Sequence, residues 1–252
     1  MIWDVALRKR FEGRKHSFEL DLRFQSNARR LVLFGPSGAG KSMTLKMIAG
    51  LETPDGGHVR MNGVDMFDRD RRVDLSPQRR GLAYVFQDYA LFPHLTVIQN
   101  IAFGLHLGLL NPGRSLRHEA VRRWIQAFHL ESVANQYPEQ LSGGQRQRTA
   151  LARALVAEPR ALLLDEPFAA LDRPLRKRLR DELARLQAQL DIPMILISHD
   201  EEDVAVLADE MVRIEHGQAG QASLLPARAR GGRSEPEAVQ STREFDWINS
   251  TL

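Results

Sequence analysis

The chain has 252 residues, of which 43% are hydrophobic and 27% are charged, a composition typical of a globular protein with a sizeable core. Its 35 basic residues barely outnumber its 32 acidic residues, and a net charge of +3 gives no argument for a nucleic acid partner. The absence of cysteine excludes disulfides and thiolate metal sites.

The sequence contains no signal for insertion into a membrane. No apolar run approaches the roughly 18 to 20 residues that a membrane-spanning helix requires. The N-terminus, Met1-Ile2-Trp3-Asp4, lacks the basic segment and the apolar stretch of a secretory signal. If the protein serves a membrane, we expect it to do so from the cytosolic side.

Apolar, strand-like runs alternate along the chain with helical patterns, which predicts an α/β fold with a parallel sheet covered by helices. Short apolar runs occupy residues 31–34, 161–164 and 194–197, and each ends in a glycine-rich, acidic or polar group. Ligands of such sheets bind just beyond the carboxyl ends of the strands. The residues that follow these three runs are therefore candidates for a functional site.

The region between about residues 88 and 145 has a different character and is predicted to be a helical insertion. Apolar residues recur there at helical spacing, and we interpret their stripe as core rather than as a cofactor site. They are Leu116, Ala120, Val121, Trp124, Ile125 and Phe128, within a helix expected over residues 115–130.

Asp172 and Pro174 predict the start of a further helix, with Asp172 as its N-cap. One face of this helix is marked by Leu175, Leu179, Leu183, Leu186 and Leu190. The apolar periodicity fades after about Gly217, and we expect residues 221–252 to form a poorly ordered tail.

Residues 35–42 read GPSGAGKS, the complete pattern of a phosphate-binding P-loop. Its glycines allow backbone angles that turn successive N–H groups toward phosphate oxygens, and the following helix adds the positive end of its dipole. We expect Lys41 to place its ammonium on the β- and γ-phosphates, and Ser42 to offer its hydroxyl to Mg²⁺. The predicted nucleotide-binding residues are Gly35, Pro36, Ser37, Gly38, Ala39, Gly40, Lys41, Ser42 and Met43.

The loop lies after the strand-like run at 31–34 and before a helical pattern at 43–49, where a P-loop has to lie. The alternative is a glycine-rich turn without a ligand. A P-loop alone does not distinguish a kinase, a GTPase, a helicase and a transporter ATPase, so other residues have to make that choice.

Two acidic residues follow the apolar run at 161–164. A buried strand would deliver Asp165 to the edge of the sheet beside the P-loop, where its carboxylate can hold Mg²⁺. Glu166 points the other way and can accept a proton from an attacking water molecule. The alternative is a surface Asp-Glu pair, but such pairs rarely follow four residues of buried type.

Residues 141–145 read LSGGQ, and the sequence RQRTALARAL follows them. Ser142, Gly143 and Gly144 would expose backbone N–H groups and a hydroxyl at a helix N-terminus, which makes a second anion site. This pentapeptide and the following helix resemble the signature of the ATP-binding-cassette (ABC) family. In that family the residues corresponding to Leu141, Ser142, Gly143, Gly144 and Gln145 close on the γ-phosphate held by the other subunit of a head-to-tail dimer.

The remaining motifs match the same family in order. Gln87, in YVFQD, resembles the Q-loop glutamine that reaches Mg²⁺ and the attacking water. Asp172, in ALD, resembles the D-loop aspartate at the dimer interface, and His199 resembles the switch histidine that contacts the γ-phosphate. Phe11 lies where the family places an aromatic ring against adenine, although a core phenylalanine is an equal alternative.

Two positions depart from the usual pattern of the family. Met43 stands where threonine is frequent, which removes a hydroxyl that would contact the α-phosphate, and Ala169 replaces a frequent serine. We expect weaker nucleotide binding at most, because the backbone N–H of Met43 can still donate.

The resemblance covers roughly residues 1 to 220 and implies a P-loop NTPase with a RecA-like core. That core would comprise residues 1–87 and 146–220, with a helical signature subdomain at 88–145. The implied protein is an ATPase that uses ATP and Mg²⁺, with Glu166, His199, Lys41 and Gln87 as catalytic residues and Ser42, Gln87 and Asp165 at the metal. It would work as a homodimer bound to permease subunits on the cytoplasmic face of the membrane.

The stretch from SPQRR through LFPHLTV is similar to the ATPases of bacterial importers, and together with DEPFAALDRPLRKRL it is most similar to the molybdate-importer subunits. The ATPases of sulfate, iron and polyamine importers share much of this sequence. Phe92, Pro93, His94 and Leu95 are expected to form part of the surface that receives the permease. A periplasmic or extracellular solute-binding protein would complete the system.

Molybdate-type subunits usually continue into a regulatory barrel, for which this chain leaves too few residues, so we expect no oxyanion site in it. Two other functions are alternatives to a transporter ATPase. A soluble ABC ATPase acting on ribosomes or DNA usually has paired cassettes or long coiled-coil insertions. A small-molecule kinase would leave LSGGQ, Gln87 and His199 without a purpose.

Overall fold

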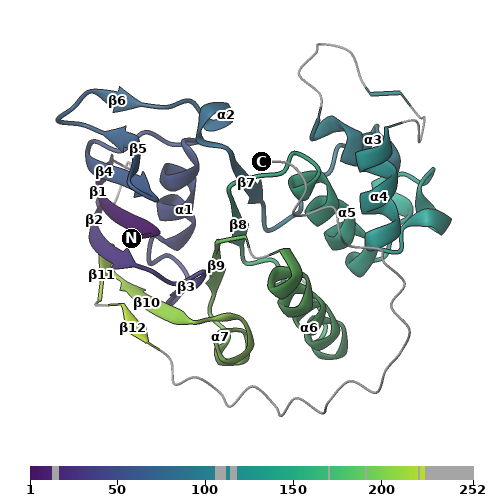
Figure 1. The fold of residues 1–252 in the computed structure, drawn as a ribbon. Coiled ribbons are helices and arrows are strands. Elements are labelled where there is room, and N and C mark those ends of the chain that lie inside the picture. The colour runs from purple at the N-terminus through teal and green to yellow at the C-terminus, as the bar shows by residue number, and fades with distance from the viewer. Residues whose placement is uncertain are drawn as a thin grey trace, which may run out of the picture.

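The computed structural model describes residues 1–12, 17–105, 112–113, 118–169, 171–190, 192–220 and 222–224, and its strands form two sheets (Figure 1). The larger sheet has the strand order β11-β10-β3-β9-β8-β7, with β12 also paired to β10. The pairs β10–β3, β3–β9, β9–β8 and β8–β7 are all parallel. Its strands are β3 (Arg30–Phe34), β7 (Leu82–Val85), β8 (Ala161–Asp165), β9 (Met194–Ser198), β10 (Glu210–Glu215), β11 (Gln218–Ala219) and β12 (Ser223–Leu224).

The three apolar runs of the sequence form the centre of this sheet, as β3, β8 and β9. All five residues of β8 and of β9 are buried. A strand that is covered on both faces has a continuous apolar sequence, which is why these three strands were recognisable in the sequence.

The smaller sheet is antiparallel and was not predicted. Its order is β2-β1-β4-β5-β6, formed by β1 (Trp3–Glu12), β2 (Ser17–Ser26), β4 (Gly56–Met61), β5 (Val64–Asp68) and β6 (Val73–Asp74). One face of β1 and β2 is buried, through residues such as Trp3, Val5 and Leu22, while charged residues alternate on the other. This period of two is the signal by which the sheet could have been found.

The helices lie on both faces of the parallel sheet. On one side is α1 (Lys41–Ala49), beside the antiparallel sheet, whereas α3, α4 and α5 lie together on the far side of β7 and β8 (Figure 1). The other helices are α2 (Pro77–Arg80), α3 (Val97–Phe103), α4 (Glu119–Ala127), α5 (Gly143–Leu155), α6 (Arg173–Leu190) and α7 (Glu201–Leu207), with 3₁₀ turns at Glu131–Val133 and Pro138–Gln140.

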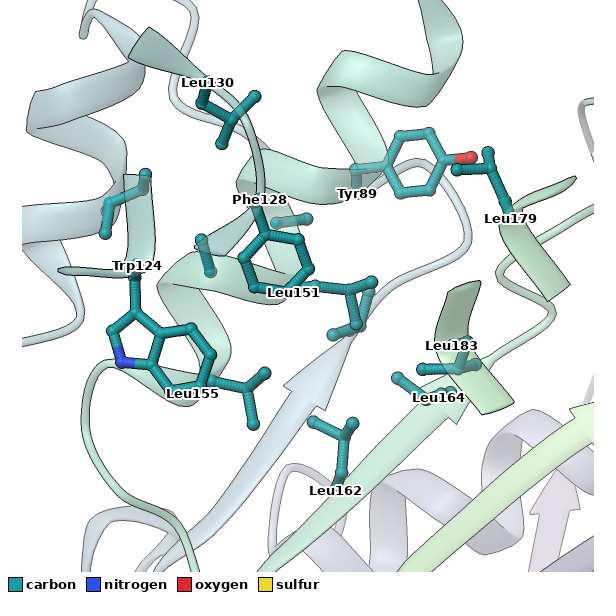
Figure 2. Close-up of a cluster of buried hydrophobic side chains, with 14 of the residues drawn as sticks. Tyr89, Trp124, Phe128, Leu130, Leu151, Leu155, Leu162, Leu164, Leu179 and Leu183 are labelled. Atoms are coloured by element: carbon teal, nitrogen blue, oxygen red, sulfur yellow. The ribbon is translucent and has the colours of Figure 1, made fainter. Parts of the chain in front are cut away.

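Two hydrophobic cores sit on the two faces of the parallel sheet. The first joins helices α3, α4, α5, α6 and α7 with one face of the sheet, and Figure 2 shows members of this cluster from the helices, such as Trp124 and Leu151, together with Leu162 and Leu164 of β8. The second joins α1 and the antiparallel sheet with the opposite face. The apolar stripe of the helical insertion is therefore core where the structure describes it, although the helix is shorter than predicted, and Leu116 lies outside the described residues.

The predicted leucine face of α6 also packs into the first core, with Leu179 and Leu183 buried. Of the region 221–252, the structure describes residues 222–224, where Ser223 and Leu224 pair with β10. The rest of that predicted tail lies outside the described residues. Among the helices of the described part, none combines the length and apolarity that crossing a bilayer requires.

Candidate nucleotide-binding site

The P-loop connects the end of β3 to the start of α1. Gly40 is the N-cap of α1 and has a φ of 99°, in the left-handed region that favours glycine. A side chain at Gly35 would place its Cβ 2.0 Å from the carbonyl oxygen of Ile214 on β10, so only glycine fits there. Pro36, Ser37 and Gly38 are exposed at this turn.

Lys41 begins α1, and its side chain folds back over the loop. It is only 4% exposed, and its Nζ donates to the carbonyl oxygens of Gly35, at 2.9 Å, and Pro36, at 2.8 Å. The same Nζ lies 3.8 Å from Oε1 of Glu166. The structure thus holds this ammonium at the centre of the loop, next to a carboxylate.

Ala39 and Met43 have a different environment from the exposed part of the loop. Ala39 is buried, and Met43 is partly buried against the second core. Ala39 thus helps to attach the loop to the core, and the Met43 side chain contacts that core. Their predicted contacts with nucleotide would be made by the backbone.

Asp165, at the end of β8, accepts two hydrogen bonds. Oγ of Ser42 donates to its Oδ1 at 2.8 Å, and the hydroxyl of Tyr84 donates to its Oδ2 at 2.8 Å. A carboxylate and a hydroxyl beside a phosphate cradle form the oxygen donor set that Mg²⁺ prefers, so the residues present fit this ion. Tyr84 was missed in the sequence, because the contact of its hydroxyl with Asp165 depends on how β7 pairs with β8.

Glu166 lies between the side chains of His199 and Lys41. Its Oε2 is 3.3 Å from Nδ1 of His199, and its Oε1 faces Lys41. Glu166 has a φ of 44°, an unusual backbone conformation for a residue with a side chain. The histidine side chain is 50% exposed, whereas that of Glu166 is 15% exposed, so the carboxylate lies at the boundary between the site and solvent.

Gln87 follows β7 by two residues, and its side chain is exposed. Since β7 and β8 are parallel, with Val85 opposite Leu164, Gln87 lies at the same edge of the sheet as Asp165. The structure therefore brings the P-loop, Gln87, Asp165, Glu166 and His199 to one edge, as the carboxyl ends of parallel strands predict.

The loop that carries His199 is fixed by a buried polar network, which sequence reasoning did not find. Ser198 donates to Oδ2 of Asp203 at 2.7 Å, and Arg180 of α6 donates to Oδ1 at 3.0 Å. Burial raises the pKa of Asp203, and the bonds from Ser198 and Arg180 only partly oppose this effect. Arg176, also on α6, pairs with Asp200 at 2.8 Å.

The signature segment caps α5. The backbone N–H of Gln145 donates to Oγ of Ser142 at 3.3 Å, and the N–H of Ser142 donates to Oε1 of Gln145 at 2.9 Å. Ser142 is exposed and Leu141 is buried, and a Cβ on Gly143 would lie 3.1 Å from Leu171. Because α5 lies across β7 and β8 from α1, the structure does not bring this segment to the P-loop of its own chain (Figure 1).

Asp172 is exposed and accepts a hydrogen bond from the N–H of Leu175 at 2.9 Å, as expected of the N-cap of α6. Phe11 is partly buried, with its ring centroid 6.1 Å from that of Phe18. Phe18 in turn lies at the P-loop, since a Cβ on Gly40 would be 3.1 Å from its Cζ. An aromatic pair therefore lies beside the loop, and the contact of Phe11 with adenine stays a prediction.

A parallel sheet whose first central strand leads into a P-loop, with a buried Asp165 facing Ser42, defines the class of P-loop nucleoside triphosphatases. The family model described as ABC transporter matches residues 19–169. This chain is a member of the ABC transporter family, and it is an ATPase that binds ATP with Mg²⁺.

Relatives and solved structures agree with this assignment. The molybdate/tungstate import ATP-binding protein WtpC of Archaeoglobus fulgidus is 44% identical over 214 residues, 85% of each chain. The sulfate/thiosulfate import ATP-binding protein CysA of Pseudomonas aeruginosa is 44% identical over 211 residues, which are 83% of this chain but 62% of that protein.

Another CysA, from Synechocystis, is 47% identical over 191 residues, 76% of this chain and 52% of that protein. The chain thus spans well under two thirds of this second sulfate/thiosulfate relative. A dimeric structure of the cassette MJ0796 in a post-hydrolysis state, bound to ADP and Pi, matches with a TM-score of 0.71 and 26% identity. It covers 90% of this chain and 100% of that one.

Proposed function

We propose that the chain is the ATP-hydrolysing subunit of an ABC importer and that it works as a head-to-tail homodimer. The main support for ATP hydrolysis at this site is the position of Glu166. Its carboxylate lies 3.8 Å from Nζ of Lys41 and 3.3 Å from Nδ1 of His199, next to the Asp165–Ser42 pair. A carboxylate, an ammonium group, an imidazole and an oxygen donor set that suits a metal thus meet at one edge of the sheet.

In this proposal Glu166 accepts a proton from the water molecule that attacks the γ-phosphate of ATP. Lys41 and His199 stabilise the charge that the transferred phosphoryl group carries. Ser42, Asp165 and Gln87 would hold Mg²⁺, which neutralises charge on the β- and γ-phosphate oxygens when it is bound. Phe11 would stack on the adenine ring.

The dimer follows from the position of the signature. Ser142 caps α5 with an exposed hydroxyl, and Gly144 adds backbone beside it, but this segment lies across the sheet from the P-loop of its own chain. A second copy placed head to tail would bring Leu141 to Gln145 onto the γ-phosphate. Asp172 would lie at the interface. The dimeric state of the MJ0796 cassette supports this arrangement.

The proposed partners are permease subunits at the cytoplasmic side of the membrane, together with a solute-binding protein outside the cell. The surface that receives the permease would be formed by Phe92, Pro93 and His94, with Phe92 packed 5.4 Å from the guanidinium of Arg153. Leu95 was expected to belong to this surface, which is wrong, because its side chain is only 1% exposed and packs inside.

For the cargo we propose a small oxyanion, molybdate or a related one. WtpC is a molybdate/tungstate import protein and the CysA proteins are sulfate/thiosulfate import proteins, so both kinds of tetrahedral oxyanion are represented among similar chains. Uptake of labelled molybdate and sulfate by cells that carry or lack this chain distinguishes the two. Uptake that does not depend on the chain for either anion contradicts the oxyanion assignment.

The function is tested with Glu166→Gln, which keeps the shape of the side chain and removes the base. We expect turnover to fall by about 10² to 10⁴-fold, while ATP still binds and the protein becomes dimeric with Mg²⁺ and ATP. Light scattering after gel filtration gives the mass of the complex. The control is Glu201→Gln, at an exposed position of α7 outside the site, which should leave both properties unchanged.

Each part of the proposal can fail separately. Fast turnover in Glu166→Gln would exclude this residue as the base. A monomer at saturating Mg²⁺ and ATP would exclude the head-to-tail dimer, as would a Ser142→Ala variant that hydrolyses ATP at the original rate.

A further inference from the structure

Tyr84 is a polar group at the nucleotide site to which no role has yet been given. It lies on β7 opposite Leu163 of β8, and its hydroxyl donates to Oδ2 of Asp165 at 2.8 Å. Asp165 is only 5% exposed, so bulk water does not replace this donor. A buried carboxylate is thus bonded to a tyrosine from the neighbouring strand.

The two oxygens of this carboxylate have different partners. Oδ1 accepts from Ser42, on the side of the P-loop, whereas Oδ2 accepts from Tyr84. A carboxylate held at both oxygens has a fixed orientation about its terminal torsion, which is otherwise broad. Ser42 is itself a candidate ligand of Mg²⁺, so Tyr84 is the partner that orients Asp165 without belonging to the metal site.

The surroundings of the Tyr84 ring also limit its movement. The ring is partly buried against the second core and packs against Phe86, with the two centroids 4.5 Å apart. The hydroxyl is therefore held in place by packing on the ring.

We propose that Tyr84 is a positioning residue that sets the affinity of the nucleotide site for Mg²⁺ by orienting Asp165. Residues that hydrogen-bond a metal ligand from behind fix its direction, and removing them typically weakens metal binding by about 10 to 100-fold. The rival explanation is structural: Tyr84 would only satisfy a buried acceptor, and its loss would affect stability and nucleotide binding without regard to the metal.

The two explanations are separated by measuring binding without turnover. The purified protein and Tyr84→Phe are titrated with a fluorescent, non-hydrolysable ATP analogue in EDTA, and then with Mg²⁺ at a fixed analogue concentration. We expect the Mg²⁺ concentration for half-saturation to rise about tenfold in Tyr84→Phe. The affinity measured in EDTA should stay the same, because the P-loop is unchanged.

Tyr89→Phe is the matched control. Tyr89 is a buried tyrosine of the same segment, but its hydroxyl donates to the carbonyl oxygen of Pro167 at 3.1 Å rather than to Asp165. This variant also loses one hydrogen-bonded hydroxyl and keeps its ring, and we expect its Mg²⁺ dependence to match that of the original chain.

Three results would overturn the proposal. The first is a half-saturating Mg²⁺ concentration in Tyr84→Phe equal to that of the original chain. The second is an equal shift in Tyr84→Phe and Tyr89→Phe, which would make the effect a general one of lost hydroxyls. The third is a loss of affinity in EDTA as large as the loss with Mg²⁺, which would make the role of Tyr84 structural.

Discussion

Glu166 adopts a left-handed backbone conformation, with a φ of 44°, directly before Pro167. This conformation costs a residue with a side chain about 1–2 kcal/mol relative to glycine. The carboxylate contacts Lys41 and His199 from this position, so the geometry of the site depends on a backbone that is unfavourable in itself.

This strain can be measured by comparing Glu166→Gly with Glu166→Gln. Both changes remove the charge, but only glycine relaxes the backbone. Glycine also gives the unfolded chain more conformational freedom, which offsets part of this stabilisation. We therefore expect Glu166→Gly to be more stable than Glu166→Gln by about 0.5–1 kcal/mol. Urea unfolding of the two variants measures the difference.

Glu158 provides the control, because it has a φ of 50° and lies outside the nucleotide site. Glu158→Gly should exceed Glu158→Gln in stability by a similar amount, while turnover is kept. If the two variants at Glu166 unfold at the same urea concentration, the backbone there is not strained.

At the scale of the element, the antiparallel sheet carries a charged cluster around Arg60. This guanidinium donates to Asp65 at 2.6 Å, to Asp68 at 2.7 Å and to Asp4 at 3.3 Å. The hydrogen bond from Arg60 lowers the pKa of Asp65. The pKa of Asp68 is lowered mainly by the hydrogen bond from the backbone N–H of Arg71, and to a smaller extent by the one from Arg60. For Asp4, bonds from His58 and other donors outweigh burial, so its pKa is lowered as well.

These shifts predict that acid destabilises the protein. A carboxyl group whose pKa is lowered by folding stabilises the folded state above its unfolded pKa, 3.8 for aspartate, and this contribution is lost as the pH falls through the lower folded value. We expect the melting temperature to fall between pH 5 and pH 3. In Arg60→Gln this part of the pH dependence should be smaller.

The control for the cluster is Arg23→Gln, at an exposed position of the neighbouring strand β2. It removes the same charge without touching Asp4, Asp65 or Asp68, so its melting temperature should follow the original pH dependence. Equal curves for Arg60→Gln and the original chain would show that the cluster does not contribute.

The two sheets differ in how well the sequence predicts them. The buried strands β3, β8 and β9 were found because they are continuous apolar runs, and α6 because Asp172 and its leucines mark the start and one face. The antiparallel strands were missed because charged residues alternate with apolar ones along them. Tyr84, and Arg180 at Asp203, were missed because such contacts depend on how separate elements are placed beside each other.

At the scale of the whole molecule, the parallel sheet separates two cores but belongs to both. Along β8, Leu162 and Leu164 face the core of α3 to α7, whereas Ala161 and Leu163 face that of α1. The helical region at 88–145 therefore has no core of its own that is independent of the sheet. We expect the described parts of the chain to unfold in one step.

Tryptophan reports on this expectation, because Trp3 lies in one core and Trp124 in the other. The chain has a third tryptophan, Trp247, so a variant with Trp124→Phe and Trp247→Phe keeps only Trp3. In this variant the change of Trp3 fluorescence during urea unfolding should coincide with the loss of helix measured by circular dichroism. The variant that keeps only Trp124 should give the same agreement. Two separated transitions would mean that the helical region unfolds by itself.

The alternation along β8 and β9 has a consequence for catalysis. A slip of one residue would exchange the side chains that line the two cores, so packing fixes how these strands are aligned. That alignment sets Asp165 opposite Ile197, and thereby the spacing between the Asp165 carboxylate and His199. The geometry of the site thus depends on buried apolar side chains of β8 and β9 that do not contact ATP. We expect substitutions of these side chains to slow ATP hydrolysis, although they lie away from the site.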